Sequence, residues 1–128
     1  MGKYDGKLMS HLFIFGTILF TVYGQLVLKW QMSTVPPFPA DPVERASFLL
    51  GLVVRPWILS CLAAGFFAFL CWAAALRGLE LSYAYPYMGA SFVLVLWFSA
   101  VFFQEPITAT KLLGTALIVA GIAVGSQG

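Results

Sequence analysis

The chain has 128 residues, of which 61% are hydrophobic and only 9% are Asp, Glu, Lys or Arg. A soluble domain carries roughly 25% charged residues, so this composition indicates a membrane protein and excludes most classes of soluble enzyme. The net charge of +2, with no basic cluster, also argues against a nucleic-acid partner.

The two cysteines give no sign of a disulfide, a metal site or a cofactor. Cys61 and Cys71 lie ten residues apart in one apolar run. In a helix they would be about 15 Å apart, which is too far for a disulfide bond. The sequence has no HExxH or CxxC motif, and we expect no cofactor and no metal.

The first apolar run covers residues 8–30, which is long enough to cross a hydrocarbon core of about 30 Å. Lys3 and Lys7 precede it, as they would in a signal peptide. The run is longer than the apolar part of a signal peptide, and no small-residue cleavage site follows it. We therefore expect an uncleaved first span.

A proline-rich segment and a short helix are predicted between the first and second spans. Asp41-Pro42-Val43-Glu44 is typical of a helix start, and Arg55-Pro56 ends the pattern. A helix over residues 42–54 is too short to cross the bilayer. We expect it to lie at the lipid headgroups as an interfacial helix.

Three further spans are predicted at residues 57–76, 81–103 and 107–124. Small residues recur at near-helical spacing in the second span and should let another helix approach closely; they are Ser60, Ala64, Ala68 and Ala75. The turn at residues 77–80 is very short, so the second and third spans should be antiparallel neighbours. Lys111 lies near the start of the last span, where its side chain can reach the membrane surface.

These elements predict an all-α membrane protein in which residues 1–128 form one domain. The domain would be a bundle of four transmembrane helices, with a short interfacial helix between spans 1 and 2. Positive charges are divided almost evenly between the two sides of this arrangement, so the positive-inside rule selects no orientation.

Polar residues recur every four positions on the first span and fall within a sector of about 120° that should face the bundle interior; they are Thr17, Thr21, Gln25 and Lys29. Gln25 and Lys29 have two interpretations. In the first, Gln25 forms a hydrogen bond with a neighbouring helix and the Lys29 side chain reaches the lipid headgroups. In the second, both residues line a cavity, in which Lys29 attracts a phosphate. Gly24 would allow a helix or a substrate to come close.

The third span begins with three tyrosines around a proline. Pro86 frees the carbonyl of Ser82 from its helical partner and should kink the span. Broken helices often mark the substrate site of a transporter, which makes Tyr83, Tyr85 and Pro86 candidate binding residues. The tyrosines could instead form an interfacial aromatic belt. Tyr83 and Tyr87 are four residues apart and face one way, whereas Tyr85 faces nearly opposite, so the three tyrosines cannot all have the same role.

Three glycines of the last span, Gly114, Gly121 and Gly125, are spaced for close contact between helices. Self-association and packing within the monomer both explain this spacing. For the charged residues at helix ends, Arg77, Glu80 and Glu105, a structural role is the simpler interpretation.

Together these motifs resemble the four-helix members of the drug/metabolite transporter superfamily, which include small multidrug resistance-like and EamA-like proteins. The motifs, in chain order, are Gly24-Gln25-Leu26 with Lys29, Leu81-Ser82-Tyr83-Ala84-Tyr85-Pro86, Glu105-Pro106, and the spacing from Gly114 to Gly121.

Two branches of that superfamily suggest different functions. Small multidrug resistance exporters have a membrane-embedded glutamate in the first span, which exchanges protons for a cationic substrate; the matching position here is Thr21. The other branch contains the subunits that flip aminoarabinose-undecaprenyl phosphate across the bacterial inner membrane. This chain resembles them, because they have the Gly-Gln pair and the Ala-Tyr-Pro motif. A longer, proline-rich first loop distinguishes this chain from them.

The resemblance to the second branch implies a flippase without covalent chemistry, located in the bacterial inner membrane. Its substrate would be a polyprenyl-phosphate-linked sugar, with Lys29 neutralising the phosphate and Thr21, Gln25 and Tyr85 donating or accepting hydrogen bonds. Four spans enclose little space, so we expect a homodimer or a heterodimer with a similar four-span protein. The alternatives are a proton-coupled exporter of small cations and a structural or regulatory membrane subunit.

Overall fold

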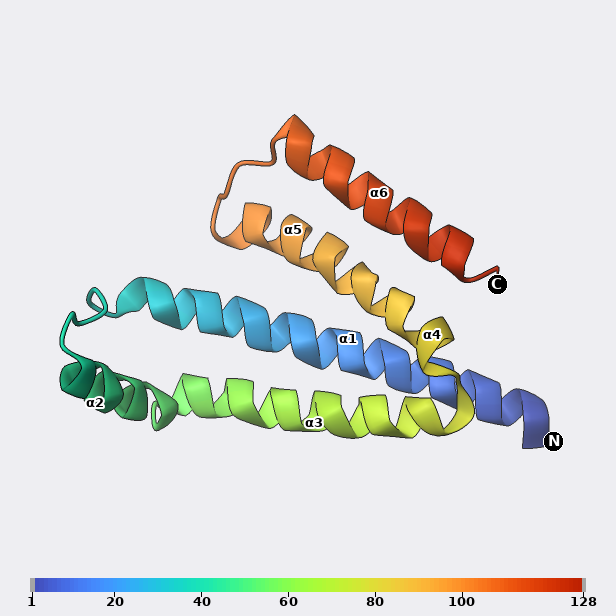
Figure 1. The fold of residues 1–128 in the computed structure, drawn as a ribbon, viewed down its shortest axis with the longest axis horizontal. Coiled ribbons are helices and arrows are strands. Elements are labelled where there is room, and N and C mark those ends of the chain that lie inside the picture. The colour runs from blue at the N-terminus through green and yellow to red at the C-terminus, as the bar shows by residue number, and fades with distance from the viewer. Residues whose placement is uncertain (1, 128) are drawn as a thin grey trace.

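In the computed structural model, which describes residues 2–127, the chain forms helices joined by short connections (Figure 1). The described residues contain no β-strand, which confirms the all-α prediction. The elements in chain order are α1 (Gly2–Thr34), α2 (Pro42–Val53), α3 (Pro56–Gly78), α4 (Leu81–Ala84), the 3-10 helix η1 (Tyr85–Gly89), α5 (Ala90–Phe102) and α6 (Ala109–Gly125).

The helices α1 and α3 form an antiparallel pair, and their contact is the most extensive in the molecule (Figure 1). Apolar residues of α1 at four-residue spacing are buried, as expected for one face of a helix. Small residues of α3 are buried with them and let the backbones approach, as the sequence predicted. The buried residues are Ile14, Ile18 and Val22 on α1, and Ala64, Ala68 and Ala75 on α3.

On its other side α1 contacts α5, and α6 lies beyond α5, so the long helices follow the order α3, α1, α5, α6 (Figure 1). The contact between α6 and η1 depends on Gly89. A Cβ at this position would lie 2.8 Å from Cδ1 of Ile122 and 3.1 Å from Cγ2 of Ile118. Glycine therefore brings the last helix close to the start of the broken third span.

The predicted break at Pro86 is confirmed. The first turn of the span, α4, is followed by the 3-10 segment η1, and regular α-helix resumes only at Ala90. Proline cannot donate a backbone hydrogen bond, and its ring clashes with the preceding turn, so the tighter 3-10 geometry replaces the α-helix here.

The helix α2 begins where the sequence predicted. The Asp41 side chain accepts a hydrogen bond from the backbone N–H of Val43 at 3.1 Å, and Pro42 occupies the first turn. The helix ends at Val53, close to the predicted boundary. Leu52 is its buried residue and packs it toward the rest of the chain.

Three helical segments of the described chain are long and apolar enough to cross a membrane: Gly6–Thr34, Pro56–Gly78 and Leu81–Phe102. The last helix, α6, is apolar but has only 17 residues, or about 25 Å, which is shorter than the bilayer core. It begins at Ala109 instead of residue 107, because Thr108 caps it by accepting a hydrogen bond from the Lys111 N–H at 3.2 Å.

Candidate functional site

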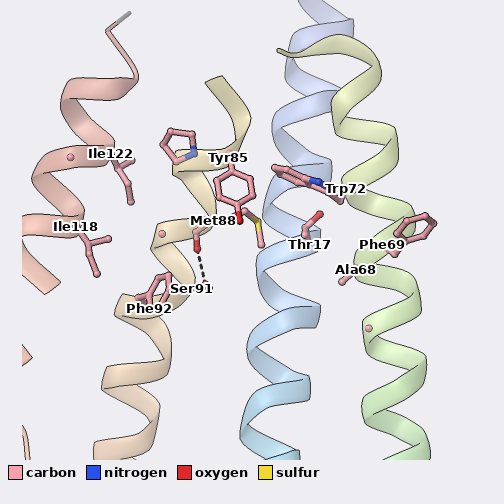
Figure 2. A pocket seen from close by; sticks show the side chains of 14 residues that line it. Thr17, Ala68, Phe69, Trp72, Tyr85, Met88, Ser91, Phe92, Ile118 and Ile122 are labelled. Atoms are coloured by element: carbon pink, nitrogen blue, oxygen red, sulfur yellow. Dashed lines mark hydrogen bonds between the residues drawn. The ribbon is translucent and has the colours of Figure 1, made fainter. Parts of the chain in front are cut away.

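A groove of about 660 Å³ crosses one face of the row of helices (Figure 2). Residues from α1, α3, η1, α5 and α6 line it, so segments far apart in the sequence contribute to one cavity. Most of its lining is apolar. The lining residues are Thr17, Gly65, Ala68, Phe69, Trp72, Tyr85, Pro86, Met88, Gly89, Ser91, Phe92, Ile118, Gly121 and Ile122.

The groove contains three hydroxyl groups, of which two are already used by the backbone. Thr17 donates to the carbonyl of Phe13 at 2.8 Å, and Ser91 donates to that of Met88 at 2.6 Å. Tyr85 is 65% exposed. Its ring meets Trp72 edge to face with ring centroids 6.1 Å apart. These two aromatic side chains, from η1 and α3, therefore contact each other and form one continuous part of the groove lining.

A second hollow of about 330 Å³ adjoins the groove and contains two of the predicted site residues. Thr21 and Gln25 of α1 line it together, and Gly65 and Ala68 of α3 line both cavities. Of the polar positions predicted to face the interior, Thr17 is buried and Thr21 is half-buried, but Gln25 is exposed. The row of helices is open on this side of α1, so the sector of polar residues predicted to face the interior is only partly enclosed.

Lys29 lies outside both cavities, near the C-terminal end of α1. Its ammonium group is 3.7 Å from a carboxylate oxygen of Glu105 in the connection between α5 and α6. The side chains are 58% and 39% exposed, so the ion pair can open to admit another anion at little cost. Glu105 pairs with Lys29 and lies three residues before Thr108, the N-cap of α6, so it is outside the first turn of that helix.

Tyr83, in α4, contacts the N-terminal part of α1 and does not line the groove that Tyr85 and Pro86 line. Its hydroxyl is 3.2 Å from Nε2 of His11 and 3.1 Å from the hydroxyl of Tyr87. Tyr83 and Tyr87 thus face one way and Tyr85 another, as their spacing predicted. His11 was not among the residues predicted from the sequence. It is the chain's single histidine, and its four-residue spacing from Lys7 was the available signal.

The three glycines predicted at an interface have different surroundings. A Cβ at Gly114 or Gly121 would meet nothing within 4 Å, and Gly121 lines the groove. A Cβ at Gly125 would lie 3.8 Å from Cγ of Pro86. The surface of α6 around Gly114 and Gly121 is therefore open, and the predicted interface stays a prediction.

The arrangement is suited to binding an amphipathic molecule. The structure places Thr21, Gln25, Tyr85 and Pro86 in two adjoining cavities, with Lys29 and Tyr83 beyond them toward opposite ends. The described residues contain no group of His, Cys, Asp and Glu side chains that could hold a metal ion. Both cysteines are free thiols and half-buried.

Comparison with known proteins supports a transporter. Residues 7–126 match the model of the EamA-like transporter family. The chain is 36% identical over 121 residues to the "probable 4-amino-4-deoxy-L-arabinose-phosphoundecaprenol flippase subunit ArnF" of Erwinia tasmaniensis, which covers 89% of this chain and 91% of the relative. It is 32% identical over 122 residues to the protein of the same name from Enterobacter sp. (strain 638), covering 90% and 92%.

A third relative, again named as a probable ArnF subunit, is from Pseudomonas aeruginosa and is 34% identical over 113 residues, or 84% of this chain and 77% of the relative. No solved structure gives a significant match. The family model covers nearly the whole chain, and the apolar helices agree with a multi-pass membrane protein. The chain therefore belongs to the EamA-like transporter family.

Proposed function

We propose that this protein is a subunit of a flippase that moves a polyprenyl-phosphate-linked sugar across the bacterial inner membrane. The carrying observation is the one-sided groove, in which apolar walls adjoin a hollow containing Thr21 and Gln25. A lipid-linked sugar needs such a path, because its tail stays in the bilayer and only its polar head crosses. The relatives' names support an aminoarabinose head on undecaprenyl phosphate.

Each predicted site residue has a role in this proposal. The Lys29 ammonium group leaves Glu105 and binds the phosphate instead. The amide of Gln25 and the hydroxyl of Thr21 form hydrogen bonds with the head. The hydroxyl of Tyr85 does the same in the groove. Tyr83 contacts the head at the other end of α1. Pro86 contributes indirectly, because the break that it causes aims Tyr85 into the groove.

We also propose that α6 completes a four-span domain and that the functional unit is a dimer. The relatives are named as subunits, which supports a second chain. The open surface around Gly114 and Gly121 can accept another helix at close range, and because Gly121 also lines the groove, that helix would border the groove. Gly125 lies at the end of the same helix. A bilayer somewhat thinner than average, or a tilt of the neighbouring helices, accommodates the 17 residues of α6.

The proposal is tested by ligand binding to the purified protein. Undecaprenyl phosphate should bind, and Lys29→Ala should weaken binding roughly tenfold, the effect of one charge-assisted contact. The matched control is Lys111→Ala, which removes an exposed lysine that donates to the carbonyl of Pro106, close to Glu105. Its affinity should be unchanged.

Two results would contradict the proposal. One is pH-dependent binding of quaternary ammonium ions with no affinity for polyprenyl phosphates, which would identify an exporter of cations. The other is binding of neither ligand class, which would favour a structural or regulatory subunit.

A further inference from the structure

A third hollow, of about 360 Å³, lies at the N-terminal end of α1, opposite to the end that carries Lys29. The start of α1, the end of α3 and the start of α4 form it. Four of its lining residues have polar or charged side chains, unlike the mostly apolar groove. The lining residues are Lys7, His11, Gly78, Leu79, Glu80 and Tyr83.

Hydrogen bonds fix the wall of this hollow. Nδ1 of His11 is 2.7 Å from the backbone carbonyl of Lys7, and since a carbonyl can only accept, Nδ1 is the donor. In a neutral imidazole Nε2 then accepts a hydrogen bond from the Tyr83 hydroxyl at 3.2 Å. The Tyr87 hydroxyl, at 3.1 Å, completes the chain by donating to Tyr83.

Along α1, the hollow lies at the depth expected for the membrane surface opposite to the one near Lys29. Lys7 and Lys29 are 22 residues apart, which is about 33 Å in a helix and close to the thickness of the hydrocarbon core. Lys7 to Gln25 and His11 to Lys29 are both intervals of 18 residues, or five helical turns. The polar groups at both ends therefore share one face of α1.

The charges at the two ends also correspond. Lys29 faces Glu105 at one end, and Lys7 shares the hollow with Glu80 at the other. Among the side chains of residues 6–127, neither Lys7 nor Glu80 forms a salt bridge. Both side chains are exposed, so a ligand in this hollow can reach a cation and a carboxylate. A purely anionic head would be repelled by Glu80, whereas a head with a phosphate and an ammonium group matches both charges.

We propose that this hollow is a second head-group site, which receives the translocated lipid at the opposite membrane surface and selects a zwitterionic head. Lys7 binds the phosphodiester, Glu80 binds an ammonium group of the sugar, and His11 with Tyr83 forms the wall. The inference rests on the proposed flippase function, and it adds a second site and the charge of the substrate.

The single histidine permits a direct test. The protein is purified without a histidine tag and labelled with [13Cε1]-histidine, so that NMR observes His11 alone. Titration with farnesyl phosphoethanolamine, a short polyprenyl phosphodiester with an ammonium group, should shift this resonance saturably. Lys7→Gln should weaken the affinity roughly three- to tenfold, because the contact is charged but exposed to solvent. Arg77→Gln, a matched loss of charge at the same membrane surface, should leave it unchanged.

The variant Glu80→Gln distinguishes binding of a zwitterionic ligand from binding of an anionic ligand. The substitution should weaken binding of farnesyl phosphoethanolamine at His11, because the ammonium group loses its partner. It should strengthen binding of farnesyl phosphate, because a like charge is removed. Changes of the same sign for both probes, or no change for either, would contradict the assignment of Glu80.

Calorimetry on the same samples distinguishes failure of this inference from failure of the proposed function. If the probes bind and Lys29→Ala weakens them while the His11 resonance does not move, the second site does not exist but the flippase proposal stands. If neither probe binds, the flippase proposal fails and the second site fails with it.

Discussion

The close contact between Ser10 on α1 and Gly78 at the end of α3 should control the stability of the helix pair. Ser10 is only 5% exposed, and its hydroxyl donates to the carbonyl of Gly6 at 2.9 Å. A Cβ added at Gly78 would overlap Oγ of Ser10, although it would lie 3.6 Å from Cβ of Ser10 and 3.8 Å from the carbonyl oxygen of Gly6. Gly78→Ala therefore meets one obstructing atom.

The size of the effect follows from that atom. To make room, the Ser10 hydroxyl must rotate away from Gly6, which costs about 0.5–1.5 kcal/mol for the hydrogen bond. The remaining overpacking brings the steric cost to about 1–3 kcal/mol. Alanine returns up to ~1 kcal/mol through its higher helix propensity. We expect Gly78→Ala to lower the free energy of unfolding by about 1–2 kcal/mol.

A double-mutant cycle isolates this contact. In a Ser10→Ala background the obstructing oxygen is absent, and the remaining 3.6 Å separation is an ordinary contact. Gly78→Ala should then be neutral or stabilising, which gives a coupling energy of about 1–3 kcal/mol. Unfolding of the four variants by SDS in detergent micelles, followed by tryptophan fluorescence, measures it. An equal loss of stability in both backgrounds would refute the assigned close approach of α1 and α3.

Three further predictions concern the binding face and the first connection. Lys29→Gln should change the free energy of unfolding by less than about 1 kcal/mol, because its ion pair with Glu105 is exposed, and chemical denaturation would detect a larger loss. Tyr85→Phe removes the hydroxyl but keeps the edge-to-face contact with Trp72, so the flipping rate should fall while the melting temperature stays constant. A flipping rate equal to that of the unchanged protein would show that the Tyr85 hydroxyl is not part of the site. Asp41→Ala removes the cap of α2 and should destabilise that helix by about 1 kcal/mol, visible as faster amide exchange in α2 with unchanged exchange in α3.

The features set by local chemistry could be predicted from the sequence. Hydrophobic length located the long helices, the Asp41-Pro42 pair located the start of α2, and Pro86 located the break before α5. Each depends on a property of a few neighbouring residues, such as a missing N–H group or a capping oxygen. The start of α6 was predicted two residues too early, because Thr108 is the residue that caps the helix.

The candidate site was only partly predictable, because it depends on how the helices are arranged. Spacing placed Thr21 beside Gln25 on one face of α1, but it could not indicate that the row of helices stays open there. The contact of His11 with Tyr83 joins residues 72 positions apart. Nothing local in either segment indicates its partner, so this cluster could be recognised only from the fold.

The central claim is that the groove carries the head of a polyprenyl-phosphate sugar from one leaflet to the other. The most direct measurement uses the protein purified from its own host, with any accompanying chain retained, and reconstituted into liposomes containing a fluorescent polyprenyl-phosphate sugar. Membrane-impermeant quenching then reports the fraction of the lipid in the outer leaflet over time. We predict that the protein speeds exchange between leaflets and that Lys29→Ala slows it. Exchange no faster than in protein-free liposomes would contradict the claim.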